Sequence, residues 1–454
     1  MSGMLTLEQL KEEFAAGSLD TVLACQVDMQ GRLMGKRFHI DYFINHAVNE
    51  THSCNYLLAT DLEMETVSGY KSTSWEAGYG DYVMKPDLTT LRRVPWLEGT
   101  ALVLCDVLDH HYNPVPHSPR AILRKQIDRL DAMGIVPMMA TELEFFMFDQ
   151  SYAEACAAGY KDMPPASSYN EDYHIFQTTK EEGVIRAIRN GVYGAGISVE
   201  CSKGEASAGQ EELNIKYDKA LNTADHHSIA KHACKEIAWQ NGKAITFMAK
   251  WHKDATGSSS HVHQSLWSKE GKPLFLDETQ PHGMSELMRH YLAGLLAHAD
   301  EVTCLLAPYI NSYKRFQEGT FAPTKAVWSL DNRTAGFRLC GAGTKGIRIE
   351  CRIGGSDLNP YLALAGQLAA GMAGIENKLP LEEEFVGDAY AGENAHRVPN
   401  TLRVAVEKLN ESSMLRAAFG DDVVDHYVRA ARWEQQAYDQ QVTDWEVARG
   451  FERC

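Results

Sequence analysis

The chain has 454 residues, a length that predicts two domains or one large domain with additions. Its 44 Lys and Arg face 61 Asp and Glu, a formal charge of −17 with no basic block, which argues against nucleic acid or an anionic membrane as a partner. Ten scattered cysteines without a CxxC pair favour a reduced, cytoplasmic protein, and we expect neither a secretion signal nor a membrane span.

Residues 1–112 predict a small β-rich domain. Thr6 and Gln9 have the spacing of a capping box ahead of a helical stripe, so a short helix is expected first. The acidic, Ser- and Gly-rich stretch 51–81 is typical of a functional loop. Three prolines in NPVPHSPR place the domain boundary after residue 112. Strands are predicted at 21–27, at 33–40 and, as a pair, within 83–109.

Residues 113–454 predict a large α+β domain built around the apolar run MATELEFFMF, residues 139–148. Side chains alternate along a strand, so Glu142 and Glu144 point the same way and repel each other. A divalent metal ion is the usual counter-charge, and a half-exposed strand with a polar face is the alternative. Further strands are expected at 244–249 and 261–267, and helices at 121–133, 218–241, 284–306 and from 382 onwards.

Other acidic and imidazole side chains supply further candidate metal ligands. Glu205 and Glu212 flank a Gly-Gln turn in GEASAGQEEL, and His261 and His263 share one face of HVH. Glu350 lies between two arginines on one strand face of GIRIECRIGG. Oxygen ligands with some imidazole suit Mg²⁺ or Mn²⁺, and the set is large enough for two ions. A lone HxH is also compatible with two hydrogen-bonded core histidines.

Basic residues are concentrated in the same part of the chain. Arginines that alternate with apolar residues suit bidentate contacts to phosphate or carboxylate, although inter-subunit ion pairs are an alternative. Beside metal-binding glutamates, they imply nucleotide-dependent phosphoryl transfer without a GxxxxGK[ST] loop or a kinase-type glycine loop. These residues are Arg315, Arg333, Arg338, Lys345, Arg348 and Arg352.

The order of these motifs resembles that of type I glutamine synthetase-fold ligases. The resemblance covers nearly the whole chain and is carried by GYGDYVMKPD, TELEFFMF, EASAGQEE, FMAKW, GSSSHVH, NSYKR, NRTAGFR and IRIECR. It implies an α+β fold with a β-grasp N-terminal domain and a catalytic domain on a curved antiparallel sheet. It also implies a dodecamer of two stacked hexamers, with each active site between two subunits.

The resemblance also implies a role for each motif residue, with ATP and two or more Mg²⁺ or Mn²⁺ ions at each site. One ion would be held by Glu144, Glu205 and Glu212, and another by Glu142, His261 and Glu350. Glutamate would be bound by Gly257, His261, Arg315 and Arg352, with Phe321 beside the amine. ATP phosphates would be contacted by His263, Arg333, Arg338, Lys345 and Arg348. The residues expected to act in catalysis are Arg315, Arg333, Glu350 and Arg352.

Two departures from the ammonia-using members concern the amine. Those members carry an aspartate in an N-terminal loop where this chain has Val67 and Ser68, and a flap glutamate where EGTFAP places Phe321. Loss of two anions removes the attraction for ammonium and leaves a surface suited to carbon. The predicted reaction is therefore ATP-dependent ligation of the γ-carboxylate of L-glutamate to a small amine, of ethanolamine or alkylamine type, through γ-glutamyl phosphate.

Three alternatives stay open at the level of sequence. In a polyamine ligase, Asp61, Glu65 or Glu76 would receive the distal ammonium group. In an ordinary glutamine synthetase, another carboxylate such as Glu65 would replace the lost aspartate. A non-catalytic structural member of the fold would be expected to lose metal ligands, and all six are present.

Overall fold

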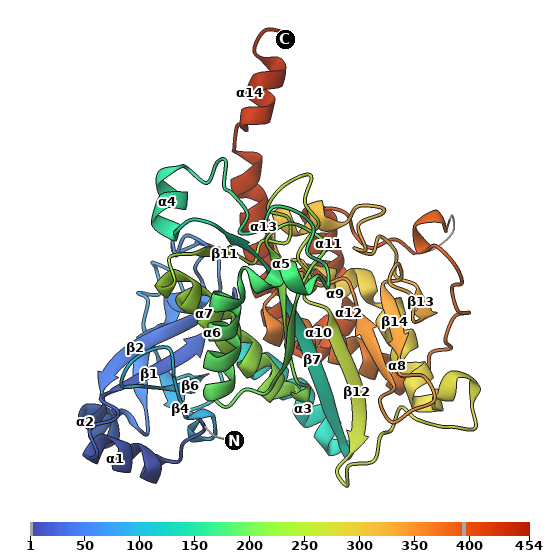
Figure 1. Ribbon diagram of the computed structural model, residues 1–454. Helices are drawn as coiled ribbons and strands as arrows, with labels where there is room; N and C mark the ends of the chain where they lie inside the picture. The colour runs from blue at the N-terminus through green and yellow to red at the C-terminus, as the bar shows by residue number, and fades with distance from the viewer. Residues whose placement is uncertain (1–2, 393–395) are drawn as a thin grey trace.

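Two β-sheets organise the chain, one within residues 21–108 and the other within residues 135–351 (Figure 1). The computed structural model describes residues 3–392 and 396–454. The first sheet has the strand order β2-β1-β6-β4-β3, with β5 paired to β6. Its strands are β1 (Thr21–Val27), β2 (Leu33–His39), β3 (Thr51–Cys54), β4 (Asp81–Pro86), β5 (Arg92–Arg93) and β6 (Thr100–Leu108).

The first sheet has the arrangement predicted for a β-grasp domain. Its central strands β1 and β6 run parallel, and the other strand pairs are antiparallel. Helix α1 (Leu7–Ala15) begins at the predicted capping box, where Thr6 accepts from the Gln9 N–H and Gln9 from the Thr6 N–H. Leu10 of α1 and Ile40 of the short helix α2 (Ile40–Tyr42) are fully buried against the sheet.

The second sheet has the order β13-β14-β15-β12-β7-β9-β8, and β10 and β11 also pair with β7. All these pairs are antiparallel except β13/β14, so the predicted fold class is confirmed with one parallel pair at the sheet edge. The strands are β7 (Ile135–Phe148), β8 (Val199–Gly204), β9 (Gln210–Ile215), β10 (Asp218–Lys219), β11 (Ala244–Thr246), β12 (Val262–Ser268), β13 (Trp328–Leu330), β14 (Phe337–Cys340) and β15 (Arg348–Cys351).

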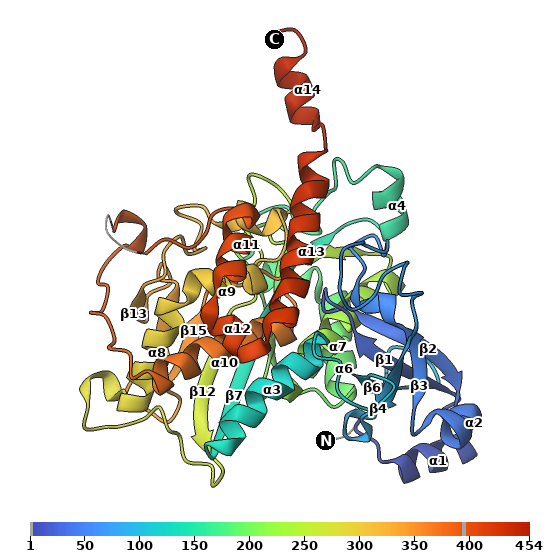
Figure 2. The same ribbon diagram turned by 180° about the vertical axis from the view of Figure 1, so that it is seen from behind.

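Helices surround the second sheet and continue to the C-terminus, which projects away from the body on α14 (Figures 1 and 2). They are α3 (Pro119–Ala132), α4 (Tyr152–Ala157), α5 (Ile175–Thr179), α6 (Glu182–Gly194), α7 (Ala220–Gln240), α8 (Glu286–Ala297), α9 (Ala299–Leu306), α10 (Pro360–Glu376), α11 (Leu402–Glu411), α12 (Ser413–Phe419), α13 (Asp421–Asp439) and α14 (Asp444–Gly450).

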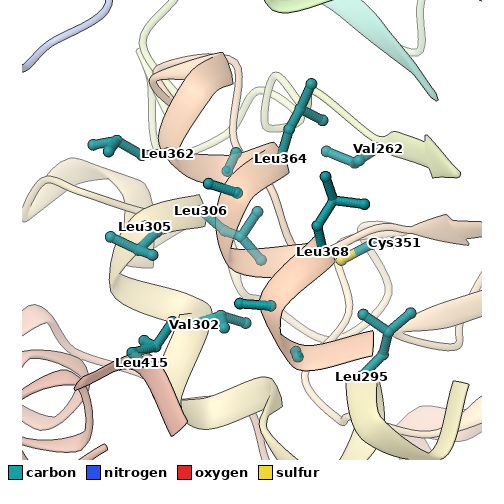
Figure 3. Close-up of a cluster of buried hydrophobic side chains, with 14 of the residues drawn as sticks. Val262, Leu295, Val302, Leu305, Leu306, Cys351, Leu362, Leu364, Leu368 and Leu415 are labelled. Carbon is teal, nitrogen blue, oxygen red and sulfur yellow. The ribbon is translucent and has the colours of Figure 1, made fainter. Parts of the chain in front are cut away.

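Helix α10 is at the centre of the hydrophobic core that packs on the second sheet. It is apolar on every side, as expected of a helix enclosed by other elements. Its side chains meet those of α8, α9, β12 and β15, including Leu368 beside Cys351 and Val262 (Figure 3). Among the described residues, no helix is both long and apolar enough to cross a bilayer.

Three details of the predicted elements are wrong. The helix predicted at 284–306 is two helices, because His298 has a non-helical backbone between α8 and α9. The helical tail predicted from residue 382 begins only at Leu402, since prolines and glycines interrupt residues 380–399; residues 393–395 lie outside the described part of the chain. Glu212, expected on a loop beside the Gly-Gln turn, lies within strand β9.

Candidate active site

Four neighbouring strands bring acidic and imidazole side chains to one face of the second sheet. Along β7, Leu143, Phe145 and Met147 point into a buried apolar cluster, which leaves Glu142 and Glu144 on the opposite face. Residues directly opposite each other in an antiparallel pair share a face. The register pairs Glu144 with Glu212 and His263 with Glu350, and therefore assembles the predicted ligands from separate parts of the chain.

The first cluster contains Glu144, Glu205 and Glu212, whose nearest carboxylate oxygens lie within 4.8 Å of one another. The Ser259 N–H fixes Glu144 by donating to Oε2 at 2.6 Å. Burial and the neighbouring Glu205 raise the pKa of Glu144 to about 8. Burial, together with Glu142 and Glu144, raises the pKa of Glu212 to about 10. The cluster holds more negative charge than the protein neutralises, which fits a divalent cation.

The second cluster surrounds Glu142. His261 Nδ1 lies 2.5 Å and His263 Nε2 2.9 Å from its two oxygens, and Glu350 Oε1 lies 3.4 Å from His261 Nδ1. Burial opposes ionisation of Glu142, but the two histidines outweigh it and hold its pKa well below its usual range. The ligand atoms that lie within 4.8 Å of one another are those of Glu142, His263 and Glu350 and, separately, those of Glu142, Glu144 and His261, so the predicted ligands Glu142, His261 and Glu350 lie near one another but do not form one such group. Carboxylate and imidazole donors suit Mg²⁺ or Mn²⁺.

Glu350 lies beneath the cleft and connects the metal ligands to the arginines. It is 1% exposed and accepts from Arg338 Nη1 at 2.8 Å and from Arg352 Nη1. Burial raises its pKa, but His261 and Arg352 prevail and lower it to about 2. This carboxylate therefore stays charged over the physiological range.

Above the clusters lies a cleft of about 850 Å³. Every predicted site residue except Glu350 lines it: Glu142, Glu144, Glu205, Glu212, Gly257, His261, His263, Arg315, Phe321, Arg333, Arg338, Lys345, Arg348 and Arg352.

The cations of the cleft differ in how they are held. Arg315 is buried and donates from both terminal nitrogens to the backbone carbonyls of Ile353 and Arg352, each at 2.8 Å. Burial lowers its pKa to about 10, with Glu144 opposing that shift. In contrast, Arg333 and Lys345 have no carboxylate within 4.0 Å among the residues that the structure describes. These two cations are available to an anionic ligand.

Phe321 forms part of the flap over the cleft, in a strained conformation. Its side chain is 56% exposed and its φ of +58° lies in the left-handed region, which is unfavourable for a bulky residue. Arg352 Nη2 donates to its carbonyl at 3.4 Å, and the Tyr390 hydroxyl donates to Ala322 O at 3.0 Å. The flap thus presents an aromatic ring, and its backbone is tied to a site arginine.

The loop expected to select the amine lies away from the cleft of its own chain. Val67 is buried, and the Ser68 carbonyl accepts from Arg429 Nε of α13 at 2.7 Å. Asp61 accepts from the Glu65 N–H at 2.9 Å and from Trp433 Nε1 at 3.2 Å. Asp61 therefore stabilises the conformation of this loop, and its carboxylate is not free to bind the distal ammonium group of a polyamine.

Sequence analysis did not identify Lys203, Ser259 and Tyr173 as site residues. Lys203 pairs with Glu205 and lies 3.5 Å from Glu212, and its Nζ lies 4.5 Å from the Tyr173 ring centroid. The position of Lys203, two residues before Glu205, was the available signal. Nothing in the local sequence indicates the contacts of Ser259 and Tyr173, because tertiary packing creates them.

Comparison with known proteins agrees with the fold and the site. Residues 116–450 match the family model described as glutamine synthetase, catalytic domain. The chain is 48% identical over 450 residues to gamma-glutamylethanolamide synthetase GlnA4 of Streptomyces coelicolor, covering 99% of this chain and 96% of that protein. It is 37% identical over 435 residues to a glutamate–isopropylamine ligase of a Pseudomonas species, covering 95% of each.

A solved structure of GmaS in complex with ADP aligns with a TM-score of 0.86 at 26% identity, over 99% of this chain and 100% of that one. The family match spans well over half of the chain, and the relatives align with almost all of it. The chain belongs to the glutamine synthetase family.

Proposed function

We propose that this protein is an ATP-dependent ligase that joins the γ-carboxylate of L-glutamate to a small organic amine, of ethanolamine or alkylamine type, through γ-glutamyl phosphate. The observation that carries this proposal is the aromatic ring of Phe321 in a flap over an otherwise complete acidic and basic site. Two relatives that align along nearly the full chain are named as ligases of glutamate with ethanolamine or isopropylamine.

Two groups of residues would hold the metal ions. Glu144, Glu205 and Glu212 would hold one ion, and Glu142, His261 and Glu350 the other, with His263 directed to the nucleotide. When bound, the ions supply positive charge that neutralises the phosphates and polarises the transferred group. The raised pKa of Glu144 and of Glu212 supports this assignment, because binding of an ion would replace the protons that these carboxyls otherwise keep.

The arginines and Lys345 would bind and orient the two anionic substrates. Arg333, Arg338, Lys345 and Arg348 would contact the ATP phosphates, and charge compensation by such groups carries much of phosphoryl transfer. Gly257 and Arg352 would bind glutamate, beside His261. A side chain at Gly257 would place a Cβ 2.4 Å from Arg315 Cγ, so Gly257 lets the arginine close over the site.

Arg315 would stabilise the backbone beside the glutamate site and would not present its whole guanidinium to the ligand. Its two terminal nitrogens already donate to Ile353 and Arg352 carbonyls. Arg315 would therefore contribute charge and rigidity beside Arg352, whose Nε and Nη1 donate to the Arg333 carbonyl and to Glu350 and whose Nη2 makes a longer contact with the Phe321 carbonyl, at 3.4 Å. Arg333 would stabilise charge on the transferred phosphoryl group, since no carboxylate competes for it among the described residues.

The amine pocket would be completed by a neighbouring subunit of a dodecamer. Loop residues 65–76 do not line the cleft of their own chain, yet Trp75 of this loop is 74% exposed. An exposed tryptophan on a β-rich domain is suited to an inter-subunit contact. With Phe321 it would form an apolar lining for the carbon skeleton of the amine.

Product analysis tests this proposal directly. Purified protein is incubated with L-glutamate, ATP, Mg²⁺ and ethanolamine or isopropylamine, and products are identified by mass spectrometry. The expected product is the γ-glutamylamide, formed in equal amount with ADP. Glutamine formed from ammonia as the main product, with no amide from either organic amine, would contradict the proposal.

A further inference from the structure

A second group of glutamates lies behind the active-site sheet, on the face of β9 opposite the metal ligands. Because side chains alternate along the strand, Glu212 points into the cleft and Glu211 points to the other side. There, Glu211 meets Glu171 and Glu181, and one oxygen from each lies within 4.8 Å of the others. These three residues, the rear cluster, are 1%, 0% and 6% exposed.

The rear cluster has no protein partner that neutralises it. None of its six carboxylate oxygens has a partner in hydrogen-bond geometry among the described residues, although Ser167 and the Gly209 N–H lie near Glu171, and no Lys, Arg or His nitrogen there lies within 4.0 Å of them. Glu181 is the N-cap residue of α6, yet its side chain does not cap the helix. Buried carboxylates without donors or counter-charges are costly, so their convergence indicates a ligand that supplies positive charge.

Charged residues of both signs lie near the rear cluster, but none of those that the structure describes forms an ion pair with its carboxylates. Burial and the Glu181 carboxylate raise the pKa of Glu171 to about 8, although Ser167 and the Gly209 N–H act in the opposite direction. Burial raises the pKa of Glu181, and the more distant charges of Lys180 and Lys243 partly oppose this rise. Arg189 is engaged with Glu182 at the surface. None of these groups neutralises the three carboxylates.

The backbone around the rear cluster is packed to hold the carboxylates in place. Gly204 of β8 lies opposite Glu211 in the sheet register. A Cβ at Gly204 would lie 2.4 Å from the Glu171 carbonyl oxygen and 2.9 Å from Glu171 Cγ. The absence of a side chain at this position therefore allows Glu171 to approach Glu211.

We propose that Glu171, Glu181 and Glu211 form a structural binding site for a large divalent cation of the Ca²⁺ type, separate from the two active-site clusters. Ca²⁺ takes six to eight oxygen ligands at about 2.3–2.6 Å in flexible geometry, which three carboxylates, each offering two oxygens, can supply. Mg²⁺ usually keeps several water molecules, and a site enclosed by α6 and the sheet suits it less.

The bound cation would fix the segment between residues 166 and 181 against the back of β9. This segment carries Asp172 and Tyr173, which line the cleft on the other side of the sheet beside Lys203. The cation would therefore position one wall of the active site without touching the substrates. This role does not depend on which amine the enzyme uses.

Ion counting tests the proposal on the full-length protein. The protein is stripped with a chelator and dialysed against ⁴⁵Ca²⁺, and bound Ca²⁺ is counted per chain in wild type, Glu171→Gln and Glu181→Gln. Both variants are expected to lose one tight Ca²⁺ per chain relative to wild type. The matched control Glu182→Gln, which changes the adjacent, partly exposed carboxyl that pairs with Arg189, is expected to keep the wild-type count.

Equal Ca²⁺ counts in all four proteins would overturn the proposal and would indicate that the rear cluster is neutralised by protons. If a variant fails to fold, crystals of the wild-type protein soaked in Mn²⁺ decide the question. Anomalous density between the three carboxylates supports the site, and its absence there, with density present at the active-site clusters, contradicts it.

Discussion

The floor and the flap of the cleft are built in opposite ways. The floor consists of side chains on adjacent strands, fixed by sheet register, burial and short contacts such as Ser259 to Glu144 and His261 to Glu142. The flap is a loop whose key residue, Phe321, is more than half exposed and held at a positive φ. A rigid floor suits phosphoryl transfer, which depends on positioning and charge, whereas a loop can change its side chains without disturbing the sheet.

This difference assigns separate tasks to the two regions. We expect changes in the floor to reduce the reaction with every amine, and changes in the flap to redistribute activity among amines. Substitutions in either region test this division, beginning with the one expected to have the largest effect.

Replacement of Glu350 by Gln should reduce activity with all amines by about 100-fold or more. The variant removes the charge that orients Arg352, Arg338 and His261. ADP release is measured at saturating substrates, with thermal unfolding to confirm that the variant folds. Glu278→Gln, at an exposed loop position, is the control and should retain wild-type activity. Full activity of Glu350→Gln would show that the charge of Glu350 is not needed for the reaction.

Metal binding to the floor should strengthen by about tenfold per pH unit for each proton displaced, between pH 6 and 8. In the metal-free protein Glu144 keeps its proton up to a pKa of about 8, against an ordinary value of 4.5. Calorimetric titration of Mn²⁺ in two buffers of different ionisation enthalpy measures the released protons. Affinity independent of pH in this range would contradict the assignment.

The same shift has a defined sign for stability. In the folded, metal-free protein Glu144 keeps its proton up to a pKa of about 8, whereas in the unfolded chain it releases the proton at about 4.5. The free energy of unfolding is therefore unaffected by this group below pH 4.5 and decreases as the pH rises from 4.5 toward 8. Thermal unfolding in chelator should therefore show a lower Tm at pH 8 than at pH 6. The difference should become smaller with Mg²⁺ or Mn²⁺ present.

Replacement of Phe321 by Glu should shift the preference toward ammonia by about tenfold or more, because a flap carboxylate attracts ammonium and opposes an alkyl chain. The ratio of kcat/KM for ethanolamine to that for ammonia is the measurement. Phe321→Gln removes the ring without adding charge, so it should weaken ethanolamine use without improving ammonia use. An unchanged ratio in Phe321→Glu would exclude the flap from amine selection.

Replacement of Lys345 by Met should have the smallest effect, raising KM for ATP several-fold with little change in kcat or Tm. Lys345 lines the cleft without a carboxylate partner among the described residues, so its loss breaks no ion pair there. Steady-state kinetics over a range of ATP concentrations measures the effect. A large loss of kcat with unchanged KM would give Lys345 a role in the chemical step instead.

The floor was predictable from sequence because it follows from strand periodicity. Alternation placed Glu142 and Glu144 on one face, and the motif spacing supplied His261 and Glu350. Strands β1, β2, β7 and β12 and helices α3 and α7 were likewise predicted to within a few residues, whereas strands β8, β13 and β14 and helices α6 and α10 were not predicted. The break at His298 was missed because the apolar pattern continues across it, while the backbone there does not. The domain boundary after residue 112 stays a prediction.

Contacts made only by tertiary packing could not be predicted. Glu171 and Glu181 converge on Glu211 although they lie 30 to 40 residues before it and follow no periodic pattern. The position of Val67 beneath α13 is of the same kind, since the loop was located only by motif spacing. Loop conformation and long-range charge pairing depend on the whole fold, and a local pattern does not encode them.

One measurement tests the central claim most directly: kcat/KM by ADP release for ammonia, ethanolamine, isopropylamine and a diamine under identical conditions. We expect a small monoamine to have the highest kcat/KM, exceeding that of ammonia by at least about tenfold, or about 1.4 kcal/mol in transition-state stabilisation. The highest value with ammonia would contradict it.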